Sequence, residues 1–428
     1  MSWTSCRSSA RSLRHFLPFQ SRSFSRSFEK LFPRASRLSP ESATGDVPSF
    51  RTQVTRINGL ASFGERLGRP RIRKQVLFFI GTSWIVYTLA VSQTQLESEF
   101  WNKRIRSVHT MWGFRTPTKE DLQRVQQMEL VARLREELVT IKKNCSLWPP
   151  LVRDVLVSTW VSRAQNYVDA TEGRRMCWKI VALNSIIFFA WKAPRFVPFL
   201  NKAFAHDPLS GRSYTLLTSM FSHKNLLHLL ANSMALASFG SAAATYLFQQ
   251  SANLPGHLPE STGKWHFLAF YITAGMFSGL VSHTVSTKVI FPRIMSELTT
   301  SAKIKASRAA SSIAASTGKA ASSTSATREI LPSIGASGAI YAAVTLSALA
   351  FPDARVQLLF LPFSSVSITT GVSGILLMDM IGIIRGWKLF DHYAHLGGAF
   401  FGAVYYWYGP EWWSYLRSNF PPRPAHSS

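Results

Sequence analysis

The sequence predicts an all-α polytopic membrane protein, and its composition and the distribution of its apolar residues indicate this class. Charged residues make up only 16% of the 428 positions, whereas a soluble globular protein carries about a quarter. Hydrophobic residues make up 46% and gather into segments near the length of about 20 residues that crosses a bilayer. The net charge of +26 lies in a leader and in loops beside apolar segments, so it does not indicate a nucleic-acid-binding protein.

The N-terminal 74 residues have the composition of a mitochondrial transit peptide followed by a basic segment. They contain fifteen Lys or Arg and four acidic residues, and the Arg/Ser-rich start has no acidic residue before Glu29. A secretory signal would contain an apolar run of at least about seven residues, and the first forty residues contain none. The alternative is a disordered basic tail. We expect residues 1–74 to address a multi-pass protein to the mitochondrial inner membrane.

Residues 75–92 form the first predicted membrane helix. Its apolar run, Val76–Ser92, follows the basic stretch Arg71–Lys74 and ends at a polar stretch. A run of this length is compatible with one crossing of a bilayer. We therefore predict one additional transmembrane helix before the main group of apolar segments.

Residues 93–176 are predicted to be a soluble, partly helical connector, because they hold ten of the 22 acidic residues. Thr118-x-x-Asp121 is a capping-box-like helix start. Apolar residues then recur every three or four positions as far as Ile141, which predicts an amphipathic helix over residues 118–143. Its apolar face has three possible partners, namely the membrane domain, the lipid surface or a partner helix.

Six further apolar segments lie between residues 177 and 408, which we predict to be one membrane domain followed by a tail at 409–428. Several segments are short or contain polar residues, which favours a compact bundle with a polar interior. Together with the first helix they predict a one-plus-six arrangement. The six segments are Cys177–Trp191, Leu226–Leu247, Trp265–His283, Ile334–Phe351, Thr369–Ile384 and Ala394–Tyr408.

An insert at residues 287–329 interrupts the membrane domain. It is rich in Ala, Ser and Lys, and it contains seven basic and two acidic residues. Because it has few bulky apolar residues, we predict a flexible loop. Basic loops tend to stay on the side that is not translocated. With seven crossings, the N-terminus and this insert would both face the matrix, and the C-terminus would face the intermembrane space.

A serine lies between small residues at the start of the fourth segment of the domain, in Gly335-Ala336-Ser337-Gly338. A helix start presents free backbone N–H groups and a positive dipole end, which can stabilise a developing oxyanion. The same small residues also suit close helix packing. The motif therefore predicts either a nucleophile or a packing contact.

A histidine lies near the start of the sixth segment, in Ala394-His395-Leu396-Gly397-Gly398. A histidine within a membrane span is costly and is usually functional. Gly398 and Gly402 form a small-xxx-small ridge that allows close approach of a neighbouring helix. If that neighbour carries Ser337, His395 lies one turn before the contact.

A third pattern lies on the second segment, where His228 and Asn232 are four positions apart. This spacing places the two side chains on one face of a helix. Two polar side chains on one face within a membrane suit either a polar helix contact or an oxyanion hole.

The three patterns, in this chain order, resemble the rhomboid protease family. The resemblance covers Trp178–Tyr408. The extra first helix and the stretches SMFSHKNLLHLLANS, PSIGASGAIYA and GWKLFDHYAHLGGAFFG are similar to the mitochondrial, presenilin-associated rhomboid-like branch. The basic insert at 287–329 departs from the family pattern.

The resemblance implies an intramembrane serine endopeptidase with a six-helix core and a Ser-His dyad. Ser337 would be the nucleophile and His395 its general base. The backbone N–H of Ser337, His228 and Asn232 would stabilise the oxyanion, and Tyr341 would support the base. Gly335, Gly338, Gly398 and Gly402 would serve helix packing. The expected partners are single-span membrane protein substrates and inner-membrane lipids, with no cofactor and no metal.

We assign structural, non-catalytic roles to the remaining polar residues of the domain. Asp391 is not assigned to the catalytic group, because the resembled family works without a carboxylate. Asp379 lies within the fifth segment, where a buried hydrogen bond between two helices is expected. His392 precedes His395 but lacks the Gly-Gly context. His223 and His283 lie near segment ends, where an interfacial role is expected.

Three alternative classes compete with the protease. A catalytically inactive rhomboid-like protein that binds membrane helices would typically lack the serine or the histidine, and both are present. A transporter would favour internal repeats with broken helices, which the sequence does not contain. An intramembrane metalloprotease requires His-Glu-x-x-His, and no such string exists in the chain.

Overall fold

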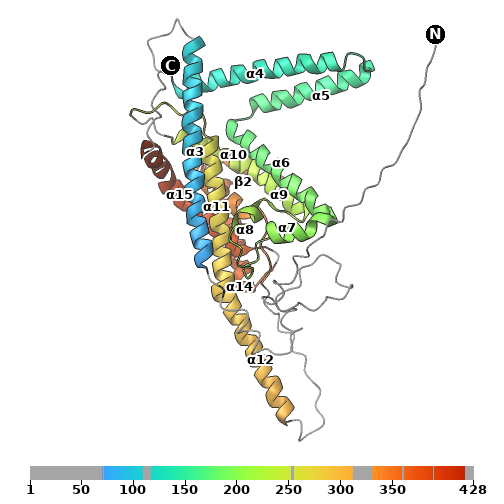
Figure 1. Cartoon of the computed structure of the whole chain (residues 1–428), viewed down its shortest axis with the longest axis vertical. Coiled ribbons are helices and arrows are strands. Elements are labelled where there is room, and N and C mark those ends of the chain that lie inside the picture. Colours follow the sequence, from blue (N-terminus) through green and yellow to red (C-terminus); the bar gives the residue numbers. More distant parts are fainter. Residues whose placement is uncertain are drawn as a thin grey trace, which may run out of the picture. The chain divides into compact units, whose positions relative to one another are not determined.

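The computed structural model describes a mostly helical chain (Figure 1). The described residues are 70, 72–108, 117–251, 255–311, 330–358, 361–388 and 390–419. The predicted transit peptide, apart from a few residues at its end, and the C-terminal tail beyond residue 419 lie outside them.

Two long helices, α3 (Arg73–Val108) and α11 (Lys264–Val285), run side by side in opposite directions (Figure 1). Lys264 Nζ lies 2.7 Å from Glu97 Oε2 near one end of the contact. Near the other end the rings of Phe79 and Phe277 pack with their centroids 5.9 Å apart. The predicted span at 75–92 lies within α3, and the helix continues for four turns beyond it because no breaker follows Ser92.

The connector forms a hairpin of two helices, α4 (Lys119–Asn144) and α5 (Pro150–Asp169). The predicted start of the first helix is confirmed, because Thr118 and Asp121 form a capping box through both backbone N–H groups. Among the described helices, α4 packs against α5 and also against α3. Near its start α4 also bonds to the core, where Gln126 Nε2 donates to the Ser261 carbonyl at 2.9 Å.

Four helices among the described residues are long and apolar enough to cross a membrane, or five if one bent pair counts as a single span. The four candidate spans run over Arg73–Ser107, Leu226–Gln249, Lys264–Ser301 and Ile368–Arg385. The bent pair is α6 (Glu172–Lys192) followed, after a turn at Pro194–Phe196, by α7 (Val197–Ala203).

The remaining helices complete the core around α13 (Ser337–Ala350), which has 14 residues and is buried along most of its length. Its neighbours include α9, α10, α11, α14 and α15. Their bounds are α8 Thr215–Thr218, α9 Leu226–Ala235, α10 Ser241–Gln249, α14 Ile368–Arg385 and α15 His392–Asn419, with short turns at Ser219–Phe221 and Leu236–Gly240.

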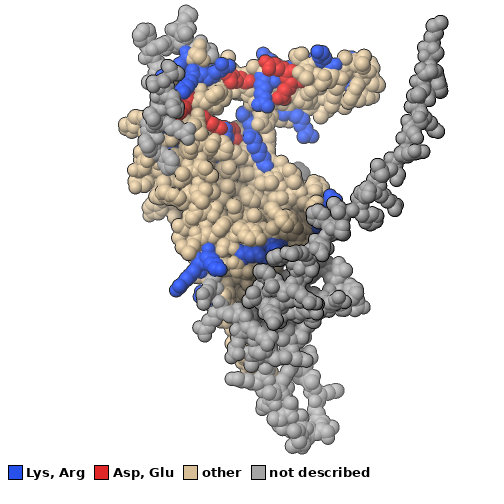
Figure 2. Space-filling model, in the orientation of Figure 1, with Lys and Arg blue, Asp and Glu red and all other residues tan. Residues whose placement is uncertain are grey.

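The surface of these core helices is largely uncharged on the face that Figure 2 shows. Blue and red side chains gather beside α4 and blue ones lie at the opposite end of the core, with a broad uncharged zone between the two groups. Apolar side chains on α14 are exposed, among them Leu377, Met380 and Ile384. An apolar exposed zone between two charged ones is the surface expected of a protein embedded in lipid.

Two expectations from the sequence are corrected. The chain is not wholly α-helical, because β1 (Arg355–Leu358) and β2 (Leu361–Ser367) form an antiparallel hairpin with Arg355 opposite Ser367. The 287–329 insert is not a loop throughout, because α12 (Phe291–Ser311) continues α11 through a turn at Ser286–Ile290.

The first half of the insert is helical for a physical reason. Phe291, Ile294 and Leu298 recur at helical spacing and pack against Ile330 in a small core of their own. Alanine, which makes the later part of the insert look low in complexity, is also the best helix former. Residues 312–329 of the insert lie outside the described part of the chain.

Candidate active site

Ser337 is the first residue of α13, and the backbone before it is held in place from two sides. Ser333 pairs with His206 through two backbone hydrogen bonds of 2.9 and 3.0 Å. Gly335 donates its backbone N–H to the Ser219 carbonyl at 3.0 Å and has a φ of 129°, a conformation that favours glycine. The serine therefore stands at a fixed helix start, where first-turn N–H groups have no partner within the helix.

His395 meets this serine from α15. Its Nε2 lies 2.9 Å from Ser337 Oγ; His395 is buried and Ser337 is half-buried. His395 lies in the first turn of α15, and its backbone N–H donates to the Asp391 carbonyl at 3.1 Å. The two residues of the predicted pair are 58 positions apart in the chain and within hydrogen-bond distance in the structure.

Glycines allow α13 and α15 to approach closely enough for this bond. A Cβ atom on Gly398 would lie 2.0 Å from the Gly338 carbonyl oxygen, and one on Gly402 would lie 2.2 Å from the Ala342 carbonyl oxygen. Real Cβ atoms do not approach backbone so closely. The predicted packing ridge is therefore where α15 meets α13, and the two helices run parallel through the contact.

The ring of Tyr341 supports the base from the side. It stacks on the imidazole of His395 with ring centroids 4.2 Å apart and an angle of 13° between the planes. Tyr341 lies one turn after Ser337 on α13, so the helix that carries the serine also fixes the plane of the base. The family resemblance implied that Tyr341 supports the base, and that role stays a prediction.

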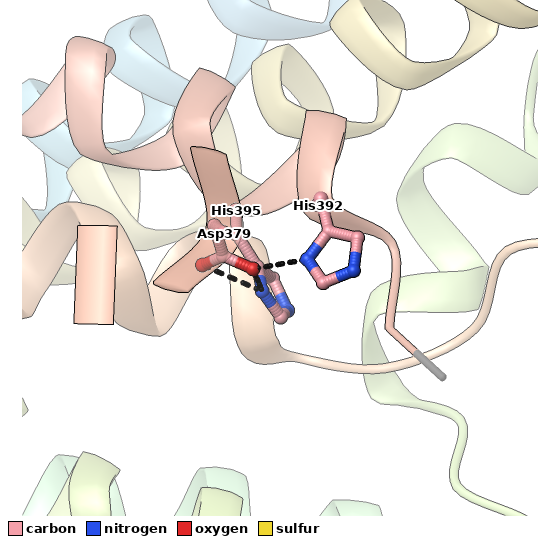
Figure 3. A group of neighbouring side chains, drawn as sticks. All are labelled: Asp379, His392 and His395. Carbon is pink, nitrogen blue, oxygen red and sulfur yellow. Dashed lines mark hydrogen bonds and ion pairs between the residues drawn. The ribbon is translucent and has the colours of Figure 1, made fainter. Parts of the chain in front are cut away.

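Asp379 on α14 bonds to the other nitrogen of the base (Figure 3). His395 Nδ1 lies 3.1 Å from Asp379 Oδ1 and 3.3 Å from Oδ2, and the carboxyl group has no exposed surface. An ionised carboxylate only accepts hydrogen bonds, so Nδ1 carries the proton and donates it. Nε2 is then free to accept the Ser337 hydroxyl.

The expectation for Asp379 was incomplete. The carboxylate does link two helices, but it does so through His395 itself, so the site contains a serine, a histidine and an aspartate in line. His392 joins the same carboxylate, with Nδ1 2.5 Å from Asp379 Oδ1. An ionisable residue within a predicted span was the available signal, but its direction on α14 could not be read from the sequence.

Two of the residues predicted to stabilise the oxyanion, His228 and Asn232, lie on α9. A Cβ atom on Gly335 would lie 2.7 Å from Cε1 and 3.3 Å from Nε2 of His228, so this imidazole borders the segment that leads to Ser337. Asn232 donates an amide N–H to the His228 carbonyl of its own helix at 2.7 Å. Because an amide has two N–H groups, Asn232 retains one for another acceptor.

His223 and His283 are buried in the structure rather than interfacial, which corrects their prediction. His223 Nε2 accepts the backbone N–H of Ala336 at 3.4 Å, and its ring meets that of His228 edge to face. His283 Nδ1 lies 3.0 Å from His206 Nε2. The position of a histidine near a segment end does not predict such contacts. For His223 the contact arises because the loop before α9 folds against the start of α13.

Asp391 stands outside the line of Ser337, His395 and Asp379, but its hydrogen bonds connect the segments around it. Its Oδ2 accepts the hydroxyls of Ser282 at 2.7 Å and Ser333 at 2.8 Å, and its Oδ1 accepts the backbone N–H of Ala394 at 3.1 Å. One carboxylate thus joins α11, the segment before Ser337 and the first turn of α15. Its exclusion from the catalytic group remains consistent with this geometry.

Comparison with known protein families identifies the domain that contains the site. Residues 210–411 match the family model described as "Rhomboid domain", and this range contains the serine, both histidines and the aspartate of the site. The chain therefore contains a rhomboid domain over residues 210–411.

The chain is also similar to mitochondrial rhomboid proteins. It is 30% identical over 60% of its length to "Presenilin-associated rhomboid-like protein, mitochondrial" of Homo sapiens, of which the match covers 58%. It is 28% identical to "Presenilin-associated rhomboid-like protein A, mitochondrial" of Danio rerio over 60% of this chain and 56% of that protein. It is 24% identical to "Rhomboid protein 1, mitochondrial" of Saccharomyces cerevisiae over 56% and 54%, respectively.

The matched region spans less than two thirds of the length of each of these relatives. No solved structure gives a significant match to the chain.

Proposed function

We propose that the chain is an intramembrane serine endopeptidase that hydrolyses peptide bonds in or near the membrane spans of other proteins. The observation that carries this proposal is the 2.9 Å contact between His395 Nε2 and Ser337 Oγ. It joins a nucleophile and a base within a helical core that has several candidate membrane spans. The match to a rhomboid domain supports the reaction type.

In the proposed reaction Ser337 Oγ attacks the scissile carbonyl carbon while His395 Nε2 takes the hydroxyl proton. Asp379 holds Nδ1–H and so keeps Nε2 as the acceptor. His395 then protonates the leaving amine, and a water molecule hydrolyses the acyl-enzyme with the same base. Positioned proton transfer contributes on the order of 10²–10⁴-fold to such a rate.

The oxyanion would form beside the start of α13. The backbone N–H of Ser337 belongs to the first turn of that helix, and the imidazole of His228 borders Gly335. A donor placed at a developing oxyanion contributes on the order of 10²–10³-fold. Asn232 is the third proposed donor, through the amide hydrogen that the His228 carbonyl does not use.

The proposed setting is the mitochondrial inner membrane, with a one-plus-six arrangement of helices in contact with its lipids. The mitochondrial relatives and the basic N-terminal leader support this location. The proposed substrates are single-span proteins of that membrane, because an extended peptide must reach a serine at a helix end within the bundle.

The site lies toward the end of the core at which α3 begins. Gly338 contacts Ser278 on α11, and the next residue along the helix toward its start, Phe277, contacts Phe79 near the start of α3. If the basic N-terminal segment stays in the matrix, the catalytic serine opens toward the matrix side. This orientation is part of the proposal.

Cleavage by the purified full-length chain in proteoliposomes tests the proposal. A model single-span protein with helix-weakening residues in its span should be cut by the parent, and Ser337→Ala should lower the rate by at least about 10³-fold. The alternative, an inactive rhomboid-like protein that binds membrane helices, predicts co-purification with the span in both forms and cleavage in neither. Equal cleavage by both forms would exclude Ser337 as nucleophile.

A further inference from the structure

The side chain of the proposed base, His395, meets two others with metal-binding atoms, Asp379 and His392 (Figure 3). Their donor atoms all lie within 4.8 Å of one another, and the three residues are at most 6% exposed. We propose that they form a binding site for a first-row divalent cation, with Zn²⁺ as the fitting ion, and that occupation of this site switches the protease off. The inhibitory part rests on the proposed function.

The donor spacing is close to what a tetrahedral ion requires. Zn²⁺ binds imidazole nitrogen and carboxylate oxygen at about 2.0–2.2 Å, so neighbouring ligand atoms stand about 3.3 Å apart. His395 Nδ1 is already 3.1 and 3.3 Å from the two oxygens of Asp379, and His392 Nδ1 is 2.5 Å from Oδ1. Opening the shorter contact by less than about 1 Å would make room for the ion.

The types of ligand favour zinc over the abundant hard cations. Two imidazoles and one carboxylate suit Zn²⁺ and related transition metals. Ca²⁺ and Mg²⁺ require six or more oxygen ligands, and this cluster offers the two oxygens of a single carboxylate. The buried negative charge of Asp379 would in turn be compensated by the cation.

Burying the imidazole of His392 costs free energy if the residue only fills space between helices. Its Nε2 has no hydrogen-bond partner among the described residues, although the residue is only 4% exposed. A Cβ atom on Gly382 would lie 2.4 Å from Cε1 and Nε2 of this ring, so α14 has a glycine where the imidazole enters. Burying this imidazole is therefore costly, and its Nδ1, which faces Asp379, is the atom that would bind the ion.

Cation binding at Nδ1 would disable the base by reversing its tautomer. Catalysis requires a proton on His395 Nδ1 and a lone pair on Nε2 toward Ser337. An ion bound through Nδ1 uses the lone pair of that atom, so the proton of the neutral ring moves to Nε2. The ring stays neutral and no proton is gained or lost, but Nε2–H cannot accept the serine hydroxyl.

Binding can be measured without protease activity. The full-length Ser337→Ala variant in detergent, which keeps all three ligands, is titrated with Co²⁺, and the visible absorption bands of four-coordinate Co²⁺ are recorded. We expect saturation near one equivalent and displacement by Zn²⁺ but not by Mg²⁺. Absence of the bands and of any Zn²⁺ binding by calorimetry would overturn the site.

Two variants assign the ion to this cluster, each made in the Ser337→Ala background. His392→Asn keeps an amide N–H near the position of Nδ1 but removes a zinc ligand, and Asp379→Asn removes the carboxylate ligand. Both should weaken Co²⁺ binding by at least tenfold, whereas His257→Asn, a histidine outside the cluster, should not. Binding that is unchanged in both cluster variants would place the ion elsewhere and contradict the proposal.

Inhibition is then measured on the active chain. Zn²⁺ should stop cleavage by the parent, a chelator should restore it, and His392→Asn should need at least tenfold more Zn²⁺ relative to its own metal-free rate. Equal sensitivity of parent and His392→Asn would refute inhibition through this site. If the parent cleaves nothing while Co²⁺ still binds the Ser337→Ala variant, the protease proposal and its inhibition fail and the metal site stands.

Discussion

Asp379 and Ser337 bind opposite nitrogens of the same imidazole, so the ring of His395 is held between a carboxylate on α14 and a hydroxyl on α13. His395 Nδ1 is 3.1 Å from the carboxylate and Nε2 is 2.9 Å from the hydroxyl. This arrangement fixes which nitrogen carries the proton. It also makes the position of α14 relative to α15 a condition for the proposed activity.

Replacing Asp379 by Asn should remove this control of the tautomer. An amide can donate to Nδ1 and so place the proton on Nε2, where it blocks the base. In a soluble serine protease such a change lowers kcat by about 10⁴-fold, and we expect at least about 10²-fold here. Steady-state cleavage should show a fall in kcat with little change in KM.

The matched control for that variant is Asp391→Asn, which leaves the tautomer of His395 untouched. If Asp379→Asn retained more than a third of the parent rate while remaining folded, the carboxylate would be a tie between helices and not part of the proton pathway.

The contact of α13 with α15 should not tolerate a methyl group at Gly398. The added Cβ would lie 2.0 Å from a backbone oxygen, which cannot move as a side chain can. Overpacking typically costs about 1–3 kcal/mol, and we expect Gly398→Ala to reach or exceed the upper value and to reduce cleavage. Thermal unfolding in detergent measures the first effect.

Gly374→Ala is the comparison for this substitution. Gly374 lies within α14 and has nothing within 4 Å of its Cβ position, so alanine should stabilise the helix by about 0.5–1 kcal/mol. Equal unfolding temperatures for the two variants would mean that the helices are further apart than described.

Replacing Asp391 should lower activity because the residue positions the segments that carry Ser337 and His395. Asp391→Ala removes the cap of α15, which is worth about 0.5–2 kcal/mol, and leaves the hydroxyls of Ser282 and Ser333 without their acceptor. We expect lower stability and a kcat reduced more than that of Asp391→Asn, whose side-chain oxygen can still cap. Full activity of the alanine variant would show that these contacts do not position the site.

A buried ion pair fixes α15 far from the catalytic residues. Arg417 Nη1 lies 2.7 Å from Glu260 Oε1, which also accepts from Trp413 Nε1 at 2.9 Å, and both charged side chains are nearly or fully buried. Arg417→Met should cost about 3–5 kcal/mol because it leaves a buried charge without its partner.

The double variant Glu260→Gln/Arg417→Met removes that charge and should recover a large part of the loss. The free energy of unfolding in a denaturant series decides this. A double variant as unstable as the single one would assign the loss to packing of the Arg417 side chain.

Much of the candidate site could be predicted from the sequence, because small residues mark where helices meet. Gly398 and Gly402 predicted a close contact, and a histidine one turn earlier predicted what that contact would bring to Ser337. The direction of Asp379 could not be predicted in the same way. A sequence gives the position of a residue along α14 but not the rotation of that helix, which depends on its packing against α15.

The fold was predictable where apolar length alone decides it, as for α3 and α14. The 287–329 insert was misjudged because alanine was counted as a lack of core residues, although Phe291, Ile294 and Leu298 already form a helical stripe. The β1–β2 hairpin was missed because a pair of short strands between two apolar helices has no distinct pattern. Its strands are joined by backbone pairing that composition does not reveal.

Labelling of the catalytic serine tests the central claim most directly. The full-length chain in proteoliposomes is treated with a fluorophosphonate probe, and the modified residue is identified by mass spectrometry. We predict modification of Ser337 in the parent and none in His395→Ala, which keeps the serine but loses its base. Labelling at another serine, or equal labelling of Ser337 without His395, would contradict a serine protease built on this pair.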